Sequence, residues 1–331
     1  MRAIYGPPLR RIEPQIRYDP HPVRSFTLRP SQSAFSLGAA AHVDENGFRA
    51  TPGRDRAQPD AIVFALGDSF TFGMGVDDEE TWPAILQQWL DTRHSHVRVI
   101  NGGTISYGVF QEMNLLQEHA PDIHPDVVIH ALYWNDYQSA HPPNPKTPSV
   151  LRPNGLFVWE PDEAPGFSIR RFFAEHSMIA TAVWNSFSRL DRDASEISDP
   201  RSYGAAYRKL VSGDLASETW RPVAEFYDQL VPVGNSLGFT TFVVIMPVVD
   251  IVSQPDPTNH PYPRLMRQLL EERHISYLDC FAVWQRSHAG TGLFLPQGPD
   301  AHLDATGYHL LVEALENALL ADRVVASHLH L

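Results

Sequence analysis

The chain has 331 residues, of which 43% are hydrophobic and one is cysteine, and its formal net charge at pH 7 is −13. This negative charge argues against a nucleic-acid partner, because the phosphates would be repelled. A single cysteine excludes an intramolecular disulfide and any multi-cysteine metal site. No stretch approaches the ~20 apolar residues of a membrane-spanning helix, so we expect no membrane span in this chain.

Residues 1–60 are rich in proline and arginine and show no sustained hydrophobic period. We expect them to form an extended N-terminal arm packed on the main domain, with a turn at Glu45-Asn46-Gly47. The first residues lack the apolar core of a secretory signal. This favours a cytoplasmic protein, or an exported one if a targeting segment is missing from the sequence.

From residue 61 onwards, short apolar runs rich in Val and Ile alternate with stretches of helical spacing. Continuous apolar runs are typical of strands that are buried on both faces of a parallel sheet. The runs that predict strands are 61–66, 97–101, 126–133, 240–246 and 276–279. Cys280 follows the last of them, which favours a small buried core residue.

The segments between the strands predict helices. Thr81-Trp82-Pro83 combines a capping residue with an early proline, which marks a helix start. Apolar residues at helical spacing predict further helices near Val109, Val223 and Leu311. Strands alternating with helices predict an α/β fold, a three-layer α/β/α sandwich with a central parallel sheet of about five strands, over residues 61–325.

An irregular insertion at about 137–204 interrupts this alternation, with many prolines at first and a polar stretch at its end. A long irregular segment in a compact domain is usually a functional loop or a disordered one. A wall or lid over the site and a plain surface loop both remain open.

Chemically suggestive residues follow the predicted strands. Gly67-Asp68-Ser69 comes directly after the first strand, Ser106 follows the second, and Asn135 follows the third. Asp300-Ala301-His302 precedes the last helix. Ligands of parallel α/β sheets bind beyond the carboxyl ends of the strands, so we expect these residues to share one site.

Four segments, 67–73, 101–108, 133–136 and 300–302, together resemble the SGNH (GDSL-type) hydrolase superfamily from about residue 45 to 320. The resemblance implies a flavodoxin-like SGNH hydrolase fold. It also implies that Ser69 is the nucleophile, that His302 is the base and that Asp300 orients the imidazole.

Elementary chemistry requires the same roles. A serine hydroxyl is a poor nucleophile unless a neighbour accepts its proton. An imidazole can take this proton and return it to the leaving group, and a carboxylate on the second ring nitrogen fixes the tautomer. Asp300 and His302 are two residues apart, so the chain must turn there for them to meet.

The oxyanion of an acyl-transfer intermediate needs hydrogen-bond donors. The Ser69 N–H at a helix N-terminus is one candidate, and the resemblance implies the Asn135 side-chain amide as another. The third family donor is a glycine N–H five residues after Asn101, where this chain has Ser106. Serine keeps the N–H but narrows the pocket, and Gly103 is the alternative donor.

Structural interpretations remain beside these functional ones. Ser69 could be a helix cap, His302 a core or surface histidine, and Asn135 the end of a strand; Asp68 suits a structural acceptor for loop N–H groups. Histidines 302 and 309 with Asp304 lack the usual metal-ligand set, so we expect no metal.

We therefore expect a serine esterase that uses an acyl-enzyme and no cofactor, acting on an acyl or acetyl ester of a small molecule or carbohydrate. The Asp-x-His spacing resembles the carbohydrate O-acetyltransferase branch of the family, so an O-acyltransferase is the alternative. A catalytically silent binding module is the second. Tyr107, Trp134 and Tyr137 flank the proposed oxyanion residues and would suit either substrate binding or core packing.

Overall fold

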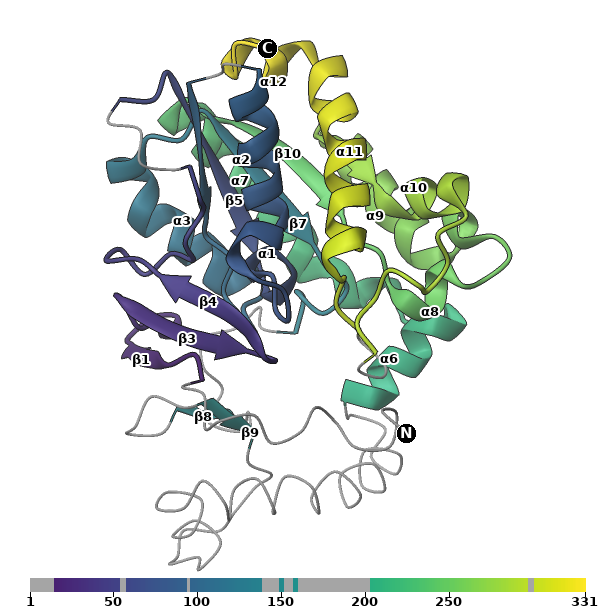
Figure 1. Ribbon diagram of the computed structural model, residues 1–331. Coiled ribbons are helices and arrows are strands. Elements are labelled where there is room, and N and C mark those ends of the chain that lie inside the picture. The colour runs from purple at the N-terminus through teal and green to yellow at the C-terminus, as the bar shows by residue number, and fades with distance from the viewer. Residues whose placement is uncertain are drawn as a thin grey trace, which may run out of the picture.

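The computed structural model describes residues 15–53, 58–93, 96–138, 149–151, 157–159, 203–296 and 301–331. Its centre is a parallel five-stranded sheet, shown in Figure 1. The strands are β5 (Ala61–Gly67), β6 (Val97–Asn101), β7 (Val127–Leu132), β10 (Thr240–Ile245) and β11 (Ser276–Asp279). This sheet confirms the predicted α/β class.

The strands lie in the order β11-β10-β7-β5-β6, and every neighbouring pair is parallel. The order reverses at β5, because the chain goes first to β6 on one side and then to β7 on the other. Ligands of open α/β sheets bind beyond the carboxyl ends of the two strands that flank such a reversal, here β5 and β7. The loops that follow β5 and β7 carry Ser69 and Asn135.

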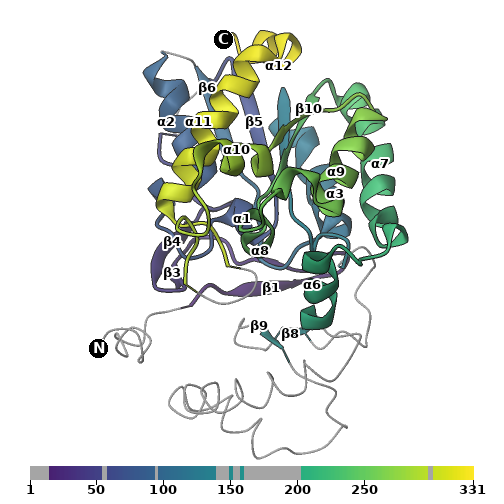
Figure 2. The same ribbon diagram turned by 90° about the vertical axis from the view of Figure 1, so that its right-hand side faces the viewer.

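Helices cover both faces of the sheet. α2 (Trp82–Thr92) packs against α11 (Ala305–Ala321) on one face, and α3 (Val109–Ile123) packs against α7 (Arg221–Leu237) on the other. Figure 2 shows the strands between these two pairs. Thr81 caps α2 and Gly238 ends α7 in a left-handed conformation, as their sequence signals indicate.

The remaining described helices are shorter or lie towards the C-terminal half. They are α1 (Ser69–Phe72), α6 (Tyr203–Ser212), α8 (Val249–Val252), α9 (Pro261–Glu271), α10 (Cys280–Ser287) and α12 (Arg323–His328), with 3₁₀ turns at Asp78–Glu80, Ser217–Trp220 and Pro257–Asn259. Within the described ranges no helix is both long enough and apolar enough to cross a bilayer.

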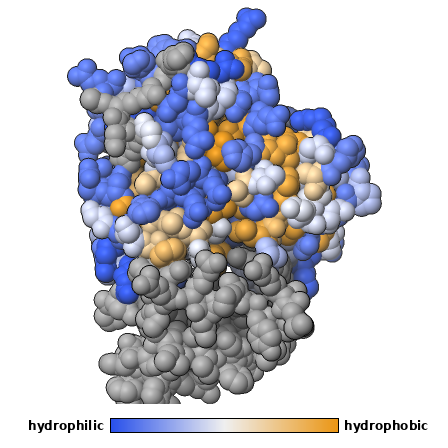
Figure 3. All heavy atoms as spheres, in the orientation of Figure 1, coloured by the Kyte–Doolittle hydropathy of each residue, from blue (hydrophilic) through white to orange (hydrophobic). Residues whose placement is uncertain are grey.

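The surface is mixed in character. Hydrophilic side chains dominate the face shown in Figure 3, and a cluster of apolar ones lies beside α11. Among the described residues, the large hydrophobic side chains that are exposed include Leu320 and Val324 near the C-terminus. Exposed apolar residues of this kind are ordinary on protein surfaces.

The N-terminal segment, residues 15–53, forms two antiparallel hairpins, where the sequence pattern predicts only an extended arm. One pairs β1 (Tyr18–His21) with β2 (Ser25–Leu28), and the other pairs β3 (Gln32–Ser36) with β4 (Ala39–Val43). The predicted turn at 45–47 is present, with Gly47 at φ +81°. The strands were missed because the hairpins are too short to show a clear hydrophobic period.

Most of the irregular insertion predicted at 137–204 lies outside the described residues. Two short strands within it, β8 (Ser149–Leu151) and β9 (Phe157–Trp159), pair in antiparallel fashion. The described residues resume at α6 (Tyr203–Ser212).

Cys280 begins α10 and is fully buried. Burial, and secondarily the neighbouring Asp279 carboxylate, raises the pKa of its thiol well above the ordinary value. We therefore expect no reaction of the native protein with an aromatic disulfide reagent at pH 8, since the thiolate is the reactive form. The denatured chain should release one equivalent of thiol. Rapid labelling of the native protein would contradict the buried position.

Candidate active site

Ser69 lies where β5 ends and α1 begins, and its side chain is nearly buried. The sharp turn depends on Gly67. Its φ is +152°, and a Cβ at this position would lie 2.3 Å from the Thr71 hydroxyl oxygen. Asp68 is the N-cap of α1 and its carboxylate accepts the Phe70 N–H at 2.9 Å. The Asp68 side chain is thus an acceptor for a loop N–H, as its position suggested.

The Ser69 hydroxyl meets His302, which is 233 residues away along the chain. The distance from Ser69 Oγ to His302 Nε2 is 2.8 Å, and both side chains are buried. The imidazole stacks on the Phe70 ring with 4.5 Å between centroids. A serine hydroxyl within hydrogen-bond distance of a buried imidazole can lose its proton to that ring.

The segment around His302 is fixed on both sides. The His302 carbonyl accepts the Leu295 N–H at 2.8 Å, and Asp304 caps α11 by accepting the Gly307 N–H. From the first turn of α11, the Tyr308 hydroxyl donates to the Phe70 carbonyl at 2.9 Å. The helix that carries Ser69 and the segment that carries His302 are therefore joined by hydrogen bonds. Asp300 lies outside the described residues.

The loop after β6 packs directly on α1. A Cβ on Gly103 would lie 2.1 Å from the Phe72 backbone nitrogen, so only glycine fits there. The Gly103 N–H donates to the Asn101 side-chain oxygen at 3.0 Å. This N–H, the alternative candidate for an oxyanion donor, is therefore already hydrogen-bonded. Ser106 is exposed and has φ +66°, a left-handed conformation that favours glycine. A left-handed conformation at this position is one that the glycine implied by the resemblance could also adopt.

Asn135 follows β7 and is half-buried. Its side-chain amide nitrogen donates to the Tyr203 hydroxyl at 3.3 Å. One of the two amide hydrogens is enough for that bond, which leaves a second for another acceptor. Tyr203, at the start of α6, was not predicted, because no local pattern marks a residue at the end of an irregular stretch.

Two of the three aromatic candidates are in the core. Tyr107 is buried and its hydroxyl donates to the Phe26 carbonyl at 2.5 Å. Trp134 is fully buried and packs against Tyr137 and Tyr203. Packing accounts for both rings. Tyr137 is only partly buried, between Trp134 and Trp220, and is the one of the three whose ring reaches the surface.

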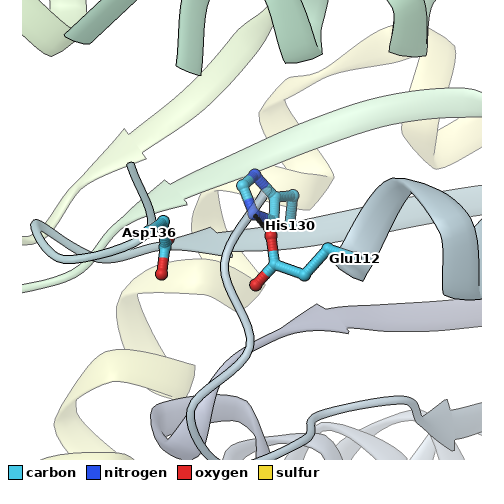
Figure 4. Close-up of side chains that lie close together, drawn as sticks. All are labelled: Glu112, His130 and Asp136. Carbon is cyan, nitrogen blue, oxygen red and sulfur yellow. Dashed lines mark hydrogen bonds and ion pairs between the residues drawn. The ribbon is translucent and has the colours of Figure 1, made fainter. Parts of the chain in front are cut away.

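Asp136, the residue after Asn135, belongs to a fully buried polar cluster with Glu112 and His130, shown in Figure 4. His130 Nε2 lies 3.0 Å from a Glu112 carboxylate oxygen, and its Nδ1 lies 2.7 Å from the Tyr227 hydroxyl. Asp136 accepts the Tyr133 N–H at 2.7 Å, and its carbonyl accepts the Val109 N–H at the start of α3. The cluster therefore joins α3 to the end of β7.

In the described part of the chain these three side chains alone approach closely enough to share a metal ion. Both ring nitrogens of His130 are already engaged with Glu112 and Tyr227. Buried polar groups need such partners, so hydrogen bonding accounts for the position of the His130 ring. The other Glu112 carboxylate oxygen, Oε1, is buried and has no hydrogen-bond partner among the described residues.

Comparison with known proteins found a matching family. The model of the GDSL-like lipase/acylhydrolase family matches residues 65–310, which spans Ser69, Asn135 and His302. No curated protein matches the sequence.

Solved structures of similar shape include three that share 11–14% of residues with this chain. TesA has 11% identity and a TM-score of 0.44, with 78% of this chain and 98% of the other covered. LAE5, an α/β hydrolase from the metagenome of Lake Arreo, has 14% identity and a TM-score of 0.46, covering 78% and 95%. The acetylxylan esterase Axe2 from Geobacillus stearothermophilus has 12% identity and a TM-score of 0.43, covering 79% and 94%.

The family match extends over most of the chain. The matched residues include the turn after β5, the loop after β7 and the segment before α11. The chain therefore belongs to the GDSL-like lipase/acylhydrolase family, the SGNH esterases, and is an ester-hydrolysing enzyme.

Proposed function

We propose that the protein is a serine esterase that cleaves an acyl or acetyl ester of a small molecule or carbohydrate through an acyl-enzyme. The observation that carries this proposal is the 2.8 Å contact between Ser69 Oγ and His302 Nε2. Ser69 is the nucleophile and His302 the general base, and Asp300 orients the imidazole. No cofactor is needed for this chemistry.

In the first half-reaction Ser69 Oγ bonds to the ester carbonyl carbon while its proton passes to His302 Nε2. The carbonyl π electrons move to oxygen and form an oxyanion. When this intermediate collapses, the bond to the alcohol oxygen breaks, and the imidazolium returns the proton to that oxygen. A water molecule then repeats the same steps on the acyl-enzyme, releasing the acid and the free serine.

Three donors can serve the oxyanion. The Ser69 N–H is at the first position of α1, and the first N–H groups of a helix have no partner within the helix. The Ser106 N–H and the Asn135 amide come from the loops after β6 and β7, at the same end of the sheet. Tyr203 supports the orientation of the Asn135 amide through its hydroxyl.

Asn135→Ala is expected to lower kcat by about 10²- to 10³-fold, because one oxyanion donor is lost. The Michaelis constant should change little, since the oxyanion exists only in the transition state and intermediate. Steady-state kinetics on a chromogenic acetyl ester measure both constants. Asn259→Ala, in an exposed 3₁₀ turn, is the matched control. A kcat within about threefold of wild type would show that Asn135 is not an oxyanion donor.

The direct test of the nucleophile is reaction with an activated organophosphate ester. Intact mass should increase by one phosphoryl adduct, and peptide mapping should find it on Ser69. Ser69→Ala should remain unmodified. An adduct on any other residue, or none, would contradict the proposed role of Ser69.

Transfer of the acyl group to an acceptor hydroxyl is the second candidate function. The Asp300-Ala301-His302 spacing favours it, because this spacing resembles the O-acetyltransferase branch of the family. Candidate sugar acceptors should be added to the ester assay and the products analysed by mass spectrometry. If no acceptor competes with water, the protein is a hydrolase. No turnover of any acyl ester, with no adduct, would point to a silent binding module.

A further inference from the structure

The N-terminal segment, residues 15–53, lies before the residues that match the family model. In Figures 1 and 2 its β3–β4 hairpin lies against the end of the sheet that carries α1. The segment joins that end of the sheet through Arg49, which follows the hairpin. The Arg49 backbone forms an antiparallel bridge with Asn101 at the end of β6.

Arg49 is fully buried, and all five N–H donors of its guanidinium are used. Nη1 donates to the Phe72 and Gly73 carbonyls at 2.7 and 2.6 Å. The remaining donors reach the Ala40 carbonyl at 2.9 Å, the Val76 carbonyl at 2.7 Å and Asp78 Oδ1 at 2.8 Å. The guanidinium carbon also lies 4.7 Å from the centre of the Phe72 ring.

The Phe72 and Gly73 carbonyls are at the C-terminal end of α1. Helix-terminal carbonyls have no partner within the helix, and a cation there interacts favourably with the helix dipole. α1 has four residues, Ser69–Phe72, and is too short to be stable by itself. The Ser69 carbonyl accepts both the Gly73 and Met74 N–H groups, so the end held by Arg49 is bonded to the nucleophile residue.

A second buried arginine of the segment reaches another loop of the site. Arg24 donates to the Tyr107 hydroxyl at 3.3 Å and to Glu118 on α3 at 2.9 Å. Tyr107 directly follows Ser106, the residue with φ +66°. The N-terminal segment thus contacts the loops after both β5 and β6.

We propose that Arg49 is a positioning residue of the active site, which holds α1 so that Ser69 Oγ stays within reach of His302. The inference rests on the proposed role of Ser69 as nucleophile. It makes the N-terminal segment part of the catalytic apparatus, although the family match begins after it. Arg49 does not touch the reacting atoms.

The test uses Arg49→Lys in the full chain. Lysine keeps the charge beside Asp78, but its three donors on one nitrogen cannot span the same carbonyls. At a temperature where circular dichroism shows a folded protein, kcat should fall roughly 10- to 100-fold, as expected for a misplaced reacting group. The Michaelis constant should stay within about threefold. The rate of phosphorylation of Ser69 by the organophosphate should fall in parallel with kcat.

Hydrogen exchange measured by mass spectrometry adds a readout that does not depend on activity. The peptide containing α1 should exchange faster in Arg49→Lys than in wild type, because the Gly73 and Met74 amides bond to the Ser69 carbonyl. Arg267→Lys is the matched control, since Arg267 also bonds one carboxylate and one backbone carbonyl, those of Asp279 and Thr258. This variant should keep wild-type kcat and wild-type exchange in α1.

A milder variant keeps the test decisive if Arg49→Lys does not fold. Asp78→Asn retains an oxygen for Arg49 Nε but removes the charge that anchors it. It should lower kcat several-fold and speed exchange in α1. A folded Arg49→Lys, or failing that Asp78→Asn, with wild-type kcat and exchange would overturn the inference.

The organophosphate adduct on Ser69 distinguishes a wrong role for Arg49 from a wrong proposed function. Wild type labelled at Ser69, with variants of unchanged rate, would refute only the role of Arg49. Wild type without an adduct would refute the nucleophile, and with it the inference.

Discussion

Ser69→Ala should lower kcat by roughly 10⁴- to 10⁶-fold, the loss seen when a nucleophile or its base is removed from a serine hydrolase. The alanine cannot form the acyl-enzyme, so only the residual effect of the binding site and the oxyanion donors remains. Ser69 Oγ contributes one hydrogen bond to His302 at 2.8 Å and a longer contact of 3.4 Å to Asp68. Its loss should shift Tm by only a few degrees.

His302→Ala should have an effect of similar size, because in the proposed mechanism the imidazole accepts the proton of Ser69 and returns it to the leaving group. The double variant should be hardly slower than either single variant, since residues that act as a unit are not additive. Steady-state kinetics with trace-contaminant controls and thermal melts measure these effects. Ser253→Ala and His309→Ala, at exposed positions, are the matched controls. Additive losses would indicate that the two residues act independently.

Glu112→Ala is expected to destabilise the protein by about 1–3 kcal/mol, as when one partner of a buried hydrogen bond is removed. The His130 nitrogen at 3.0 Å from Glu112 would lose its partner in a site without solvent. An unpaired buried polar group carries its full desolvation cost. Because the cluster joins α3 to the end of β7, activity should fall as the fold loosens. Urea denaturation gives the change in the free energy of unfolding.

Glu112→Gln separates the hydrogen bond from the charge. Its amide oxygen can still accept from His130, so the loss should be smaller than for alanine. Glu313→Ala, on the exposed face of α11, should change stability by no more than about 0.5 kcal/mol. A loss below about 1 kcal/mol for Glu112→Ala would show that the buried cluster contributes little to stability.

The strands of the central sheet could be predicted because each is buried on both faces. A strand of this kind must be a continuous apolar run, and such runs are visible without any knowledge of neighbours. The predicted ranges 97–101 and 276–279 match β6 and β11, and the other three strands differ by one residue at one or both ends. Strand ends are set by turns and caps, which are weaker signals.

The site was predictable in part. Ser69, Asn135 and His302 stand in chain order after strands or before a helix. The sheet topology then brings the first two to the carboxyl ends of the neighbouring strands β5 and β7. Tyr107 and Trp134 could not be assigned from sequence, because an aromatic residue beside a catalytic one suits core and pocket equally. Their burial depends on Phe26 and on α6, which are distant in the chain.

The sequence by itself determined the α/β class, the strands of the sheet and the residue types of the hydrolase motif, because each depends on local pattern and spacing. Only the tertiary structure decided which distant groups meet: Ser69 with His302, Arg49 with the end of α1, and Glu112 with His130. Such contacts depend on how elements pack in three dimensions. Arg49 in particular lies among many arginines of a segment without periodicity, and its burial is set by a hairpin, a 3₁₀ turn and a helix end together.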